Sequence, residues 1–274
     1  MKQEGRAVKY DSELKVESYH FQGVMQEFPN HFHEYYVIGF IEKGQRYLFC
    51  KAKEYIVGYG DLLLFNPRDN HTCRQVDGQT LDYRCINIQP EVMSKAAFEI
   101  TGQAYLPYFT SPVIFHSELV CVLKELHQMV MQEEKDFRKE EIFLFLLEQL
   151  LEEYSEQEVP QGDLEQRTAA KAICEFLEEH YMENITLDDL SALTGLSKYY
   201  LLRSFTKQKG ISPYSYLETI RIINAKELLR QGILPIDAAL RTGFADQSHF
   251  TNFFKKFIGL TPKQYMNIFK DTLG

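Results

Sequence analysis

The sequence predicts an α+β multidomain fold, with an N-terminal all-β barrel, appended helices and a C-terminal all-α domain. Three observations predict it. Up to about residue 90, short strand-like runs alternate with Gly and Pro turns. Residues 118–155 carry apolar side chains at helical spacing, and the C-terminal region contains a repeat of about fifty residues. At 274 residues, the chain has room for two domains.

The N-terminal third is predicted to form short strands joined by turns. A Gly58-Tyr59-Gly60-Asp61 turn separates two of them. Many short strands with turn residues between them favour a small barrel or sandwich. The expected strands are Tyr35–Ile41, Arg46–Cys50, Tyr55–Val57, Leu62–Phe65 and Leu81–Ile88.

Two antiparallel amphipathic helices are expected within Glu118–Ser155, on either side of the charged stretch Gln132–Glu141. Their apolar faces exceed what one small barrel needs, so both a dimer interface and simple packing on the barrel remain open. The following stretch, Glu152–Gln166, is polar and interrupted by Pro and Gly, which predicts a hinge or tether.

The C-terminal repeat aligns two copies of one unit. Thr194-Gly195-Leu196 matches Thr242-Gly243-Phe244, and with one inserted residue the rest falls into register. A repeat of this length is normally one supersecondary unit used twice. The later matches are Leu201 with Phe250, Phe205 with Phe254, Lys207 with Lys256, Gly210 with Gly259 and Tyr216 with Tyr265.

Each copy is predicted to be two short helices joined by a glycine turn. In the first, Thr186 with an acidic residue three positions later gives a capping-box-like start, and Gly195 ends the helix. Ser197 is the expected N-cap of the next helix. In the second copy, Asp246 is the N-cap and Gly259 the stop. This is the helix-turn-helix pattern, whose second helix enters the DNA major groove.

These residues resemble the AraC/XylS family of bacterial transcription regulators. The resemblance is carried by Thr242–Phe250, Phe254–Lys256 and Gly259–Tyr265, and the upstream copy, Leu190–Tyr216, is similar. It implies one helical domain in which a long helix, expected at Pro213–Arg230, joins two helix-turn-helix units. Such a helix is about 27 Å long, on the scale of the ~34 Å between successive major-groove segments.

The second helix of each unit, its recognition helix, holds the candidate DNA contacts. The recognition helix of the first unit exposes Tyr199, Tyr200, Leu202, Arg203 and Lys207 opposite its buried face. The family's contact positions match Tyr199, Leu202 and Arg203 on this helix. On the recognition helix of the second unit, they match Gln247, Ser248, His249, Thr251 and Asn252. Arg203 suits guanine or phosphate and Asn252 suits adenine, whereas Lys207, Lys255 and Lys256 suit phosphate. Merely solvated helix faces remain the alternative for any single residue.

Two N-terminal stretches resemble the cupin-type sensory domain found in many AraC-type regulators. They are His31-Phe32-His33 and Gly60–Pro67 followed by His71, and the resemblance covers about residues 15–90. It implies a small-molecule effector bound inside the barrel. The candidate effector-binding residues are His31, His33, Tyr36, Arg46, His71 and Tyr83.

The histidines His31, His33 and His71 are also weak candidates for a metal site. Two histidines separated by one residue on a strand share a face, and a third from a neighbouring strand would complete a facial site. Enzymatic cupins usually add a Glu, where this chain has Val37 and Ile38. A polar effector pocket, a bound metal and purely structural histidines all stay open, and no cofactor is expected.

The net charge of −9 is unevenly distributed. Residues 167–274 hold 14 Lys and Arg against 11 Asp and Glu, a net charge of +3, whereas residues 1–166 hold 16 against 28, a net charge of −12. A weakly basic C-terminal part predicts DNA affinity from a few well-placed contacts, and the acidic part is expected to stay clear of DNA.

The remaining features exclude other classes. The sequence has no apolar run of about eighteen residues and no signal peptide at its start, which predicts neither a membrane span nor secretion. Its five scattered cysteines indicate a reducing cytoplasm.

The sequence therefore predicts a cytoplasmic, sequence-specific transcription regulator controlled by a small-molecule effector, with no catalytic residue assigned. Expected partners are double-stranded DNA, the effector, a second copy of the chain and RNA polymerase. The alternatives are a metal-dependent cupin enzyme fused to a DNA-binding domain, and a ligand-independent dimeric regulator. The expected division is an effector domain, a dimerisation or packing segment, a linker and a DNA-binding domain, at residues 1–115, 116–155, 156–166 and 167–274.

Overall fold

A computed structural model describes residues 4–76, 78–134, 138–156, 164–196 and 198–269. The described residues fall into two compact units. The first lies within Met1–Glu27 and His33–Val159, and the second within Phe28–Phe32 and Pro160–Gly274. In the described ranges, every helix is too short or too polar to cross a bilayer.

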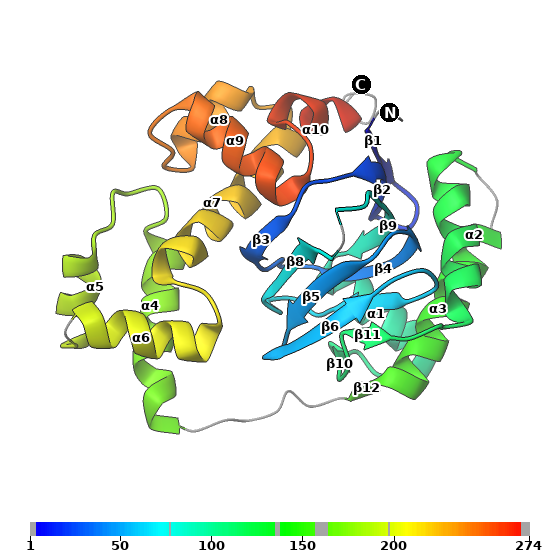
Figure 1. The fold of residues 1–274 in the computed structure, drawn as a ribbon, viewed down its shortest axis with the longest axis horizontal. Helices are drawn as coiled ribbons and strands as arrows, with labels where there is room; N and C mark the ends of the chain where they lie inside the picture. The colour runs from blue at the N-terminus through cyan, green and yellow to red at the C-terminus, as the bar shows by residue number, and fades with distance from the viewer. Residues whose placement is uncertain (1–3, 77, 135–137, 157–163, 197, 270–274) are drawn as a thin grey trace. The chain divides into compact units, whose positions relative to one another are not determined.

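The first unit is built on a six-stranded antiparallel sheet with the strand order β1-β2-β9-β4-β7-β11 (Figure 1). Its strands are β1 (Gly5–Asp11), β2 (Val16–Val24), β4 (Tyr36–Lys43), β7 (Leu62–Phe65), β9 (Leu81–Ile88) and β11 (Val113–Ile114). In a second sheet, β5 (Arg46–Cys50) pairs with β6 (Lys53–Val57) on one side and β8 (His71–Gln75) on the other. The short strands β10 (Tyr108–Phe109) and β12 (Ser155–Glu156) pair with each other.

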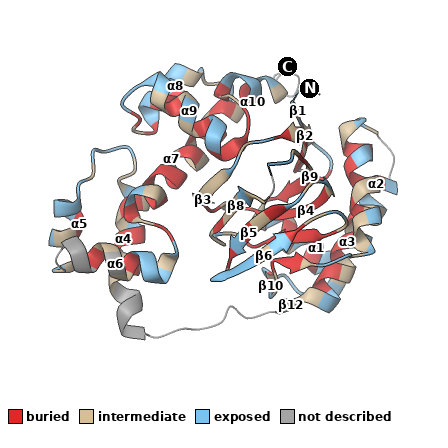
Figure 2. Ribbon diagram, viewed as in Figure 1, coloured by how far each residue is buried: buried red, intermediate tan, exposed pale blue. Residues whose placement is uncertain are grey.

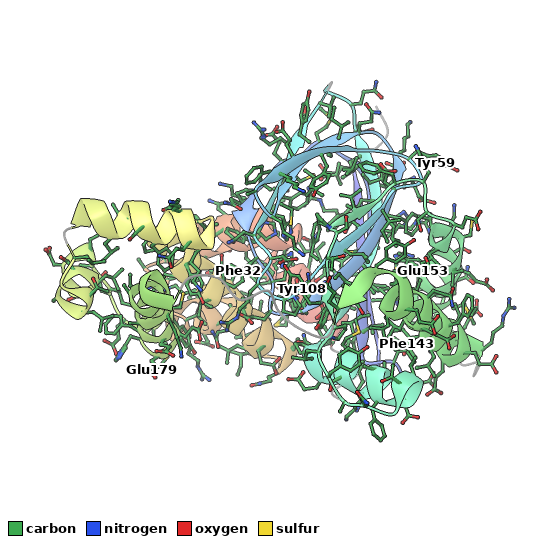
Figure 3. All side chains as sticks on the ribbon, turned by 90° about the horizontal axis from the view of Figure 1, so that it is seen from below. Phe32, Tyr59, Tyr108, Phe143, Glu153 and Glu179 are labelled. Atoms are coloured by element: carbon green, nitrogen blue, oxygen red, sulfur yellow. The ribbon has the colours of Figure 1, made fainter. Side chains whose placement is uncertain are left out.

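One face of the six-stranded sheet packs against helices. Because successive residues of a strand point to opposite faces, Tyr36, Ile38 and Phe40 share this face, as do Ile86 and Ile88 of β9. They belong to one hydrophobic cluster with residues of α1 (Pro90–Thr101), α2 (Leu119–Met131) and α3 (Arg138–Tyr154). Figure 2 shows the corresponding strands and the inward sides of α2 and α3 as buried, and Figure 3 labels Phe143 of α3, a member of this cluster.

The pair α2 and α3 confirms the two helices predicted on either side of a charged break. The unpredicted helix α1 begins at Pro90, where a proline fits the first turn because the missing N–H has no intrahelical partner there. The apolar faces of α2 and α3 cover the sheet, so packing on the barrel accounts for their buried residues.

The second unit is helical around α7. It contains α4 (Leu164–Glu179), α5 (Leu187–Thr194), α6 (Lys198–Lys209), α7 (Pro213–Arg230), α8 (Pro235–Arg241), α9 (Gln247–Ile258) and α10 (Pro262–Ile268), together with the short strand β3 (Phe28–His31). The long helix has the predicted bounds. Ser212 caps it through a hydrogen bond from the Ser215 backbone amide, and Pro213 occupies the first turn.

A hydrophobic cluster joins α7 to the helices of the first repeat. Leu217 and Ile220 of α7 pack with Leu190 of α5 and with Leu201 and Phe205 of α6. This packing makes α7 the common support of both repeats, since it also contacts α8, α9 and α10.

Candidate nucleic-acid interface and effector site

The first helix-turn-helix unit consists of α5 and α6. The Thr186 hydroxyl accepts a hydrogen bond from the Asp189 backbone amide, and the Asp189 carboxylate accepts one from the Thr186 amide. Gly195 then ends α5 in the left-handed region, with φ of 68°. These features confirm the predicted capping box and C-cap. Ser197, the predicted N-cap of α6, lies outside the described residues.

The second unit, α8 and α9, repeats this arrangement. The Asp246 carboxylate accepts a hydrogen bond of 2.7 Å from the His249 backbone amide, which confirms the predicted N-cap. Gly259 ends α9 with φ of 83°. Phe250 and Phe254 are fully buried, as are their repeat partners on α6, so both second helices bury the predicted face.

The opposite face of α9 is polar and open to solvent. Its exposed residues are Gln247, Ser248, Asn252, Lys255 and Lys256, and Thr251 beside them is half-buried. Positions 248, 252 and 255 follow one another at spacings of four and three, so their side chains lie along one side of the helix. A helix that buries one side against its own domain and offers amides, a hydroxyl and lysines on the other can enter a major groove.

His249 differs from the other predicted contacts on α9. Its ring lies edge-on to Phe244, at 5.7 Å between ring centroids, and to Phe253, at 5.0 Å. The side chain is half-buried, packed against its own helix and the preceding turn.

On α6, Lys207 is exposed and Leu202 is half-buried. The side chains of Tyr199, Tyr200 and Arg203, which the sequence places on the same reading face, lie outside the described residues. The backbone of α6 carries all three positions as a regular helix.

In the first unit, the face of the six-stranded sheet that points away from α1, α2 and α3, here called the inner face, carries polar side chains. Register pairs Glu17 of β2 with Asn87 of β9, and Tyr19 with Cys85, so all four point to the side opposite the helices. The Tyr19 hydroxyl donates a hydrogen bond of 2.9 Å to the Glu17 carboxylate. Gly39 lies opposite Cys85 on the next strand.

The inner face also keeps more residual exposure than the outer one. Val37, Leu63 and Cys85 retain 4%, 6% and 5% of their surface, whereas Ile38, Leu64 and Ile86 on the outer face retain none. Along these neighbouring strands, the inner-face side chains therefore keep slightly more accessible surface than the outer core.

Tyr83 continues this inner face. It keeps accessible surface, yet burial, as the largest cause, raises the pKa of its hydroxyl well above the usual value. Burial, and then the charge of Glu17, also raise the pKa of Tyr35. Both hydroxyls therefore stay protonated near neutral pH and can donate hydrogen bonds.

Two of the three candidate histidines join this region. His33 stacks on Tyr35 at 4.8 Å and lies 5.1 Å from His71, measured between ring centroids, and His71 stacks on Phe65 at 4.1 Å. Burial lowers the pKa of His71 to about 4, so it is neutral at physiological pH. His31 ends β3 and belongs to the second unit, so the first unit alone supplies two of the three histidines.

The expected strand containing His31 and His33 is wrong, because β3 ends at His31 and His33 lies outside a strand. Tyr36, which the sequence analysis gave as a candidate effector-binding residue, does not lie on the inner face. Its ring packs on Phe109 in the outer core, and its hydroxyl donates to the Pro107 carbonyl. The neighbouring Tyr35, with the opposite parity, is the inner-face residue.

Arg46, another candidate effector-binding residue, is completely buried, and its side chain binds backbone carbonyls. Its guanidinium donates hydrogen bonds to the backbone carbonyls of Val24, Gln45 and Gln79, at 2.8–3.0 Å. Three carbonyls held by one side chain tie the end of β2 to the loops beside β5 and β9. The inner-face residues that sequence reasoning missed are Glu17, Tyr19, Tyr35, Cys85 and Asn87.

Two family models match the chain. One, described as an AraC-like ligand binding domain, matches residues 14–147, and one, described as a helix-turn-helix domain, matches residues 190–268. The Bacillus subtilis (strain 168) protein named "Uncharacterized HTH-type transcriptional regulator YbfI" is 61% identical over 249 residues, 91% of this chain and 90% of that protein.

More distant transcription regulators are also similar to this chain over most of its length. The HTH-type transcriptional activator RhaS of Escherichia coli (strain SMS-3-5 / SECEC) is 26% identical over 86% of this chain and 87% of its own. The crystal structure of unsaturated fatty acid bound wild-type ToxT from Vibrio cholerae strain SCE256 has a TM-score of 0.55 at 17% identity, over 99% of each chain, which shows a shared fold. With a ligand-binding domain before two helix-turn-helix units, this chain belongs to the AraC-type family of transcriptional regulators.

Proposed function

We propose that this regulator binds its effector on the inner face of the six-stranded sheet and reads DNA with the exposed faces of α6 and α9. The observation that carries the effector site is that polar groups gather on the face of the sheet opposite the helices, where the side chains keep slightly more accessible surface. The DNA-reading role is supported by two second helices that bury equivalent positions and expose polar ones.

The inner-face groups favour a ligand that carries hydroxyl or amino groups. Glu17 and Asn87 offer oxygen acceptors directly opposite each other, and the hydroxyls of Tyr35 and Tyr83 offer donors. Aromatic rings beside them provide apolar surface for the rest of a small molecule. A ligand that prefers one arrangement of the chain shifts its DNA binding by that difference in affinity.

Thermal unfolding of the full chain against a library of small metabolites tests the effector site. A true effector raises the melting temperature of the wild type and changes its DNA affinity, and it does neither with Asn87→Ala or Tyr83→Phe. Tyr59→Phe is the matched control, because Tyr59 is 77% exposed. A compound that acts equally on all variants would place the site elsewhere.

The same screen separates the alternatives. An unchanged melting temperature across the library, with intact DNA binding, would favour a ligand-independent regulator. Tightly bound stoichiometric metal in the purified protein, lost on replacing His33 or His71, would favour a metal-dependent enzyme.

The DNA interface is tested with duplexes selected from a random-sequence library by the full chain. Asn252→Ala is expected to cost about 1–3 kcal/mol on the selected duplex and to relax one base preference, whereas Lys255→Ala weakens all sequences and lowers the salt slope by about one. Arg203→Ala is expected to cost about 1–3 kcal/mol through the first unit. Lys53→Ala on the exposed strand β6 is the control. Unchanged affinity in all three would overturn the interface.

We further propose that α2 and α3 pair two copies of the chain, and that residues 156–166 act as the linker to the DNA-binding domain at 167–274. Phe145 on α3 is 48% exposed although the helix already packs on the sheet, which leaves apolar surface for a second copy. Sedimentation of wild type and Phe145→Glu tests this: a dimer that becomes a monomer supports the interface. RNA polymerase is a further proposed partner, to be tested by transcription in a purified system.

A further inference from the structure

Glu218 is a buried carboxyl in the first half of α7. It is 3% exposed, and its Oε1 makes no hydrogen bond within the described part of the chain. The nearest cationic candidate is His249 of the second recognition helix, with Nε2 3.8 Å from that oxygen. An acid at this position costs stability that an apolar residue would not, so its contact with α9 calls for an explanation.

The surroundings of Glu218 keep a proton near it. Burial is the largest influence and raises the pKa of Glu218 to about 7, against the opposing effects of a hydrogen bond with Tyr214 and the charges of Arg221 and Lys256. Arg221 does not neutralise it by direct contact, because its guanidinium donates to the carbonyls of Tyr181 and Glu183. The ionisable groups facing Glu218 are therefore Tyr214 and Arg221 from α7, and His249 and Lys256 from α9.

His249 is in turn held at the start of α9. Its backbone amide makes the N-cap hydrogen bond to Asp246, and its ring is bracketed by Phe244 and Phe253. The ring nitrogen Nε2 lies 3.8 Å from Glu218 Oε1, and 40% of the His249 side chain remains exposed. Ser248 and Asn252, on the exposed face, lie one and three positions away.

We propose that Glu218 is a positioning residue that holds the His249 imidazole by electrostatic attraction while the pair carries one proton, and thereby sets the angle at which α9 meets DNA. With one proton in the pair, the two side chains attract each other. Without it, the buried Glu218 carboxylate lacks that proton and the attraction is weaker. Recognition by the second unit therefore weakens as the pH rises through about 7. The inference rests on the proposed DNA-reading role of α9.

The test uses the full chain and a duplex that the wild type selects from a random library at about pH 6. Between about pH 6 and about pH 8, the affinity of the wild type is expected to fall about tenfold, the equivalent of one pKa unit. Glu218→Gln keeps the shape but cannot ionise, so its profile is expected to be flat, and His249→Gln is expected to behave alike. Glu227→Gln, an exposed acid on the same helix, is the control and should follow the wild type.

A second selection with the wild type at about pH 8 shows which half-site loses its base preference. Loss confined to one half-site, abolished as a pH effect in Glu218→Gln, supports the positioning role. Equal pH profiles in wild type, Glu218→Gln and His249→Gln would overturn it, as would an equal loss at both half-sites. If Glu218→Gln does not fold, His249→Gln alone decides. Failure of the DNA interface itself is distinguished by Asn252→Ala and Lys255→Ala, which would then leave binding unchanged at every pH.

Discussion

A Cβ atom on Gly243 would lie 2.7 Å from the carbonyl oxygen of Tyr181. The carbonyl oxygen of Met182 would be 2.9 Å away, so both obstacles are backbone atoms. For Gly195, the equivalent residue of the first repeat, no described atom lies within 4 Å of the same position. The turn of the second helix-turn-helix unit is thus packed against the loop before α5, and the described residues make no such contact with the first turn.

Alanine at these two glycines should therefore have unequal effects. Both have positive φ, so either substitution costs about 1–2 kcal/mol of backbone strain. Gly243→Ala should lose a further ~1–3 kcal/mol, because the backbone of residues 181 and 182 must move. Urea unfolding of the full-length variants measures both, and equal losses would contradict the close packing of the second turn.

The ion pair between Lys139 and Asp11 predicts a large effect of removing one partner. Lys139 Nζ lies 2.6 Å from Asp11 Oδ2, and both side chains are almost completely buried. Lys139→Met should destabilise the first unit by about 3 kcal/mol, because it leaves a buried carboxylate without its cation. Lys9→Met, which breaks the exposed pair with Glu133, should cost less than about 1 kcal/mol in the same unfolding measurement. The idea fails if the two variants lose the same stability.

His127 should make the protein less stable in acid. It is completely buried on α2, its Nε2 donates to the Tyr19 carbonyl at 2.9 Å, and burial lowers its pKa to about 4. In the unfolded chain, the His127 ring takes up a proton near pH 6.5, whereas in the folded chain it does so only near pH 4. The contribution of neutral His127 to the free energy of unfolding is therefore complete above pH 6.5 and is lost as the pH falls from 6.5 to about 4.

The size of this contribution is up to about 3 kcal/mol, from 1.36 kcal/mol per pKa unit. His127→Gln keeps a donor for the Tyr19 carbonyl but has no titrating ring, so its stability should fall less between about pH 6.5 and 4. Melting temperatures of both proteins across this range give the difference. Parallel curves would show that His127 does not titrate differently on folding.

Gly39 makes room for Tyr83 on the inner face. A Cβ at Gly39 would lie 2.3 Å from the Tyr83 hydroxyl and 2.7 Å from the ring carbon that bears it. Gly39→Ala should cost about 1–3 kcal/mol by overpacking. In the Tyr83→Ala background the same change should cost much less, and a double-mutant cycle of unfolding free energies measures that coupling. Additive effects would mean that the two residues do not share the space.

The helical unit could be predicted closely from the sequence because its signals are local. Caps such as Thr186 and Asp246 and stops such as Gly195 and Gly259 act on residues within one turn. Repetition reinforced each signal, since two copies had to agree in register. The bounds of α7 followed from Ser212 and Pro213 at its start.

The first unit was predicted less well because strand facing depends on distant partners. Tyr35, Tyr36, Val37 and Ile38 are all apolar or aromatic, so the sequence does not reveal which of them face inward. The pairings of β4 with β7 and, more than forty residues later, with β9 fix which residues face inward. Glu17 and Asn87 were missed for the same reason, because 70 positions of sequence separate two residues that lie directly opposite.

The rigid helix α7 also constrains the DNA that this protein can recognise. One base pair inserted between two half-sites moves them apart by about 3.4 Å and rotates one against the other by about 35°. An 18-residue helix capped at its start and packed along its length cannot stretch or twist to follow. The DNA would have to bend or unwind instead, at its own energetic cost. Operators of this regulator should therefore share one spacer length, which makes them searchable in genome sequence by spacing as well as by bases.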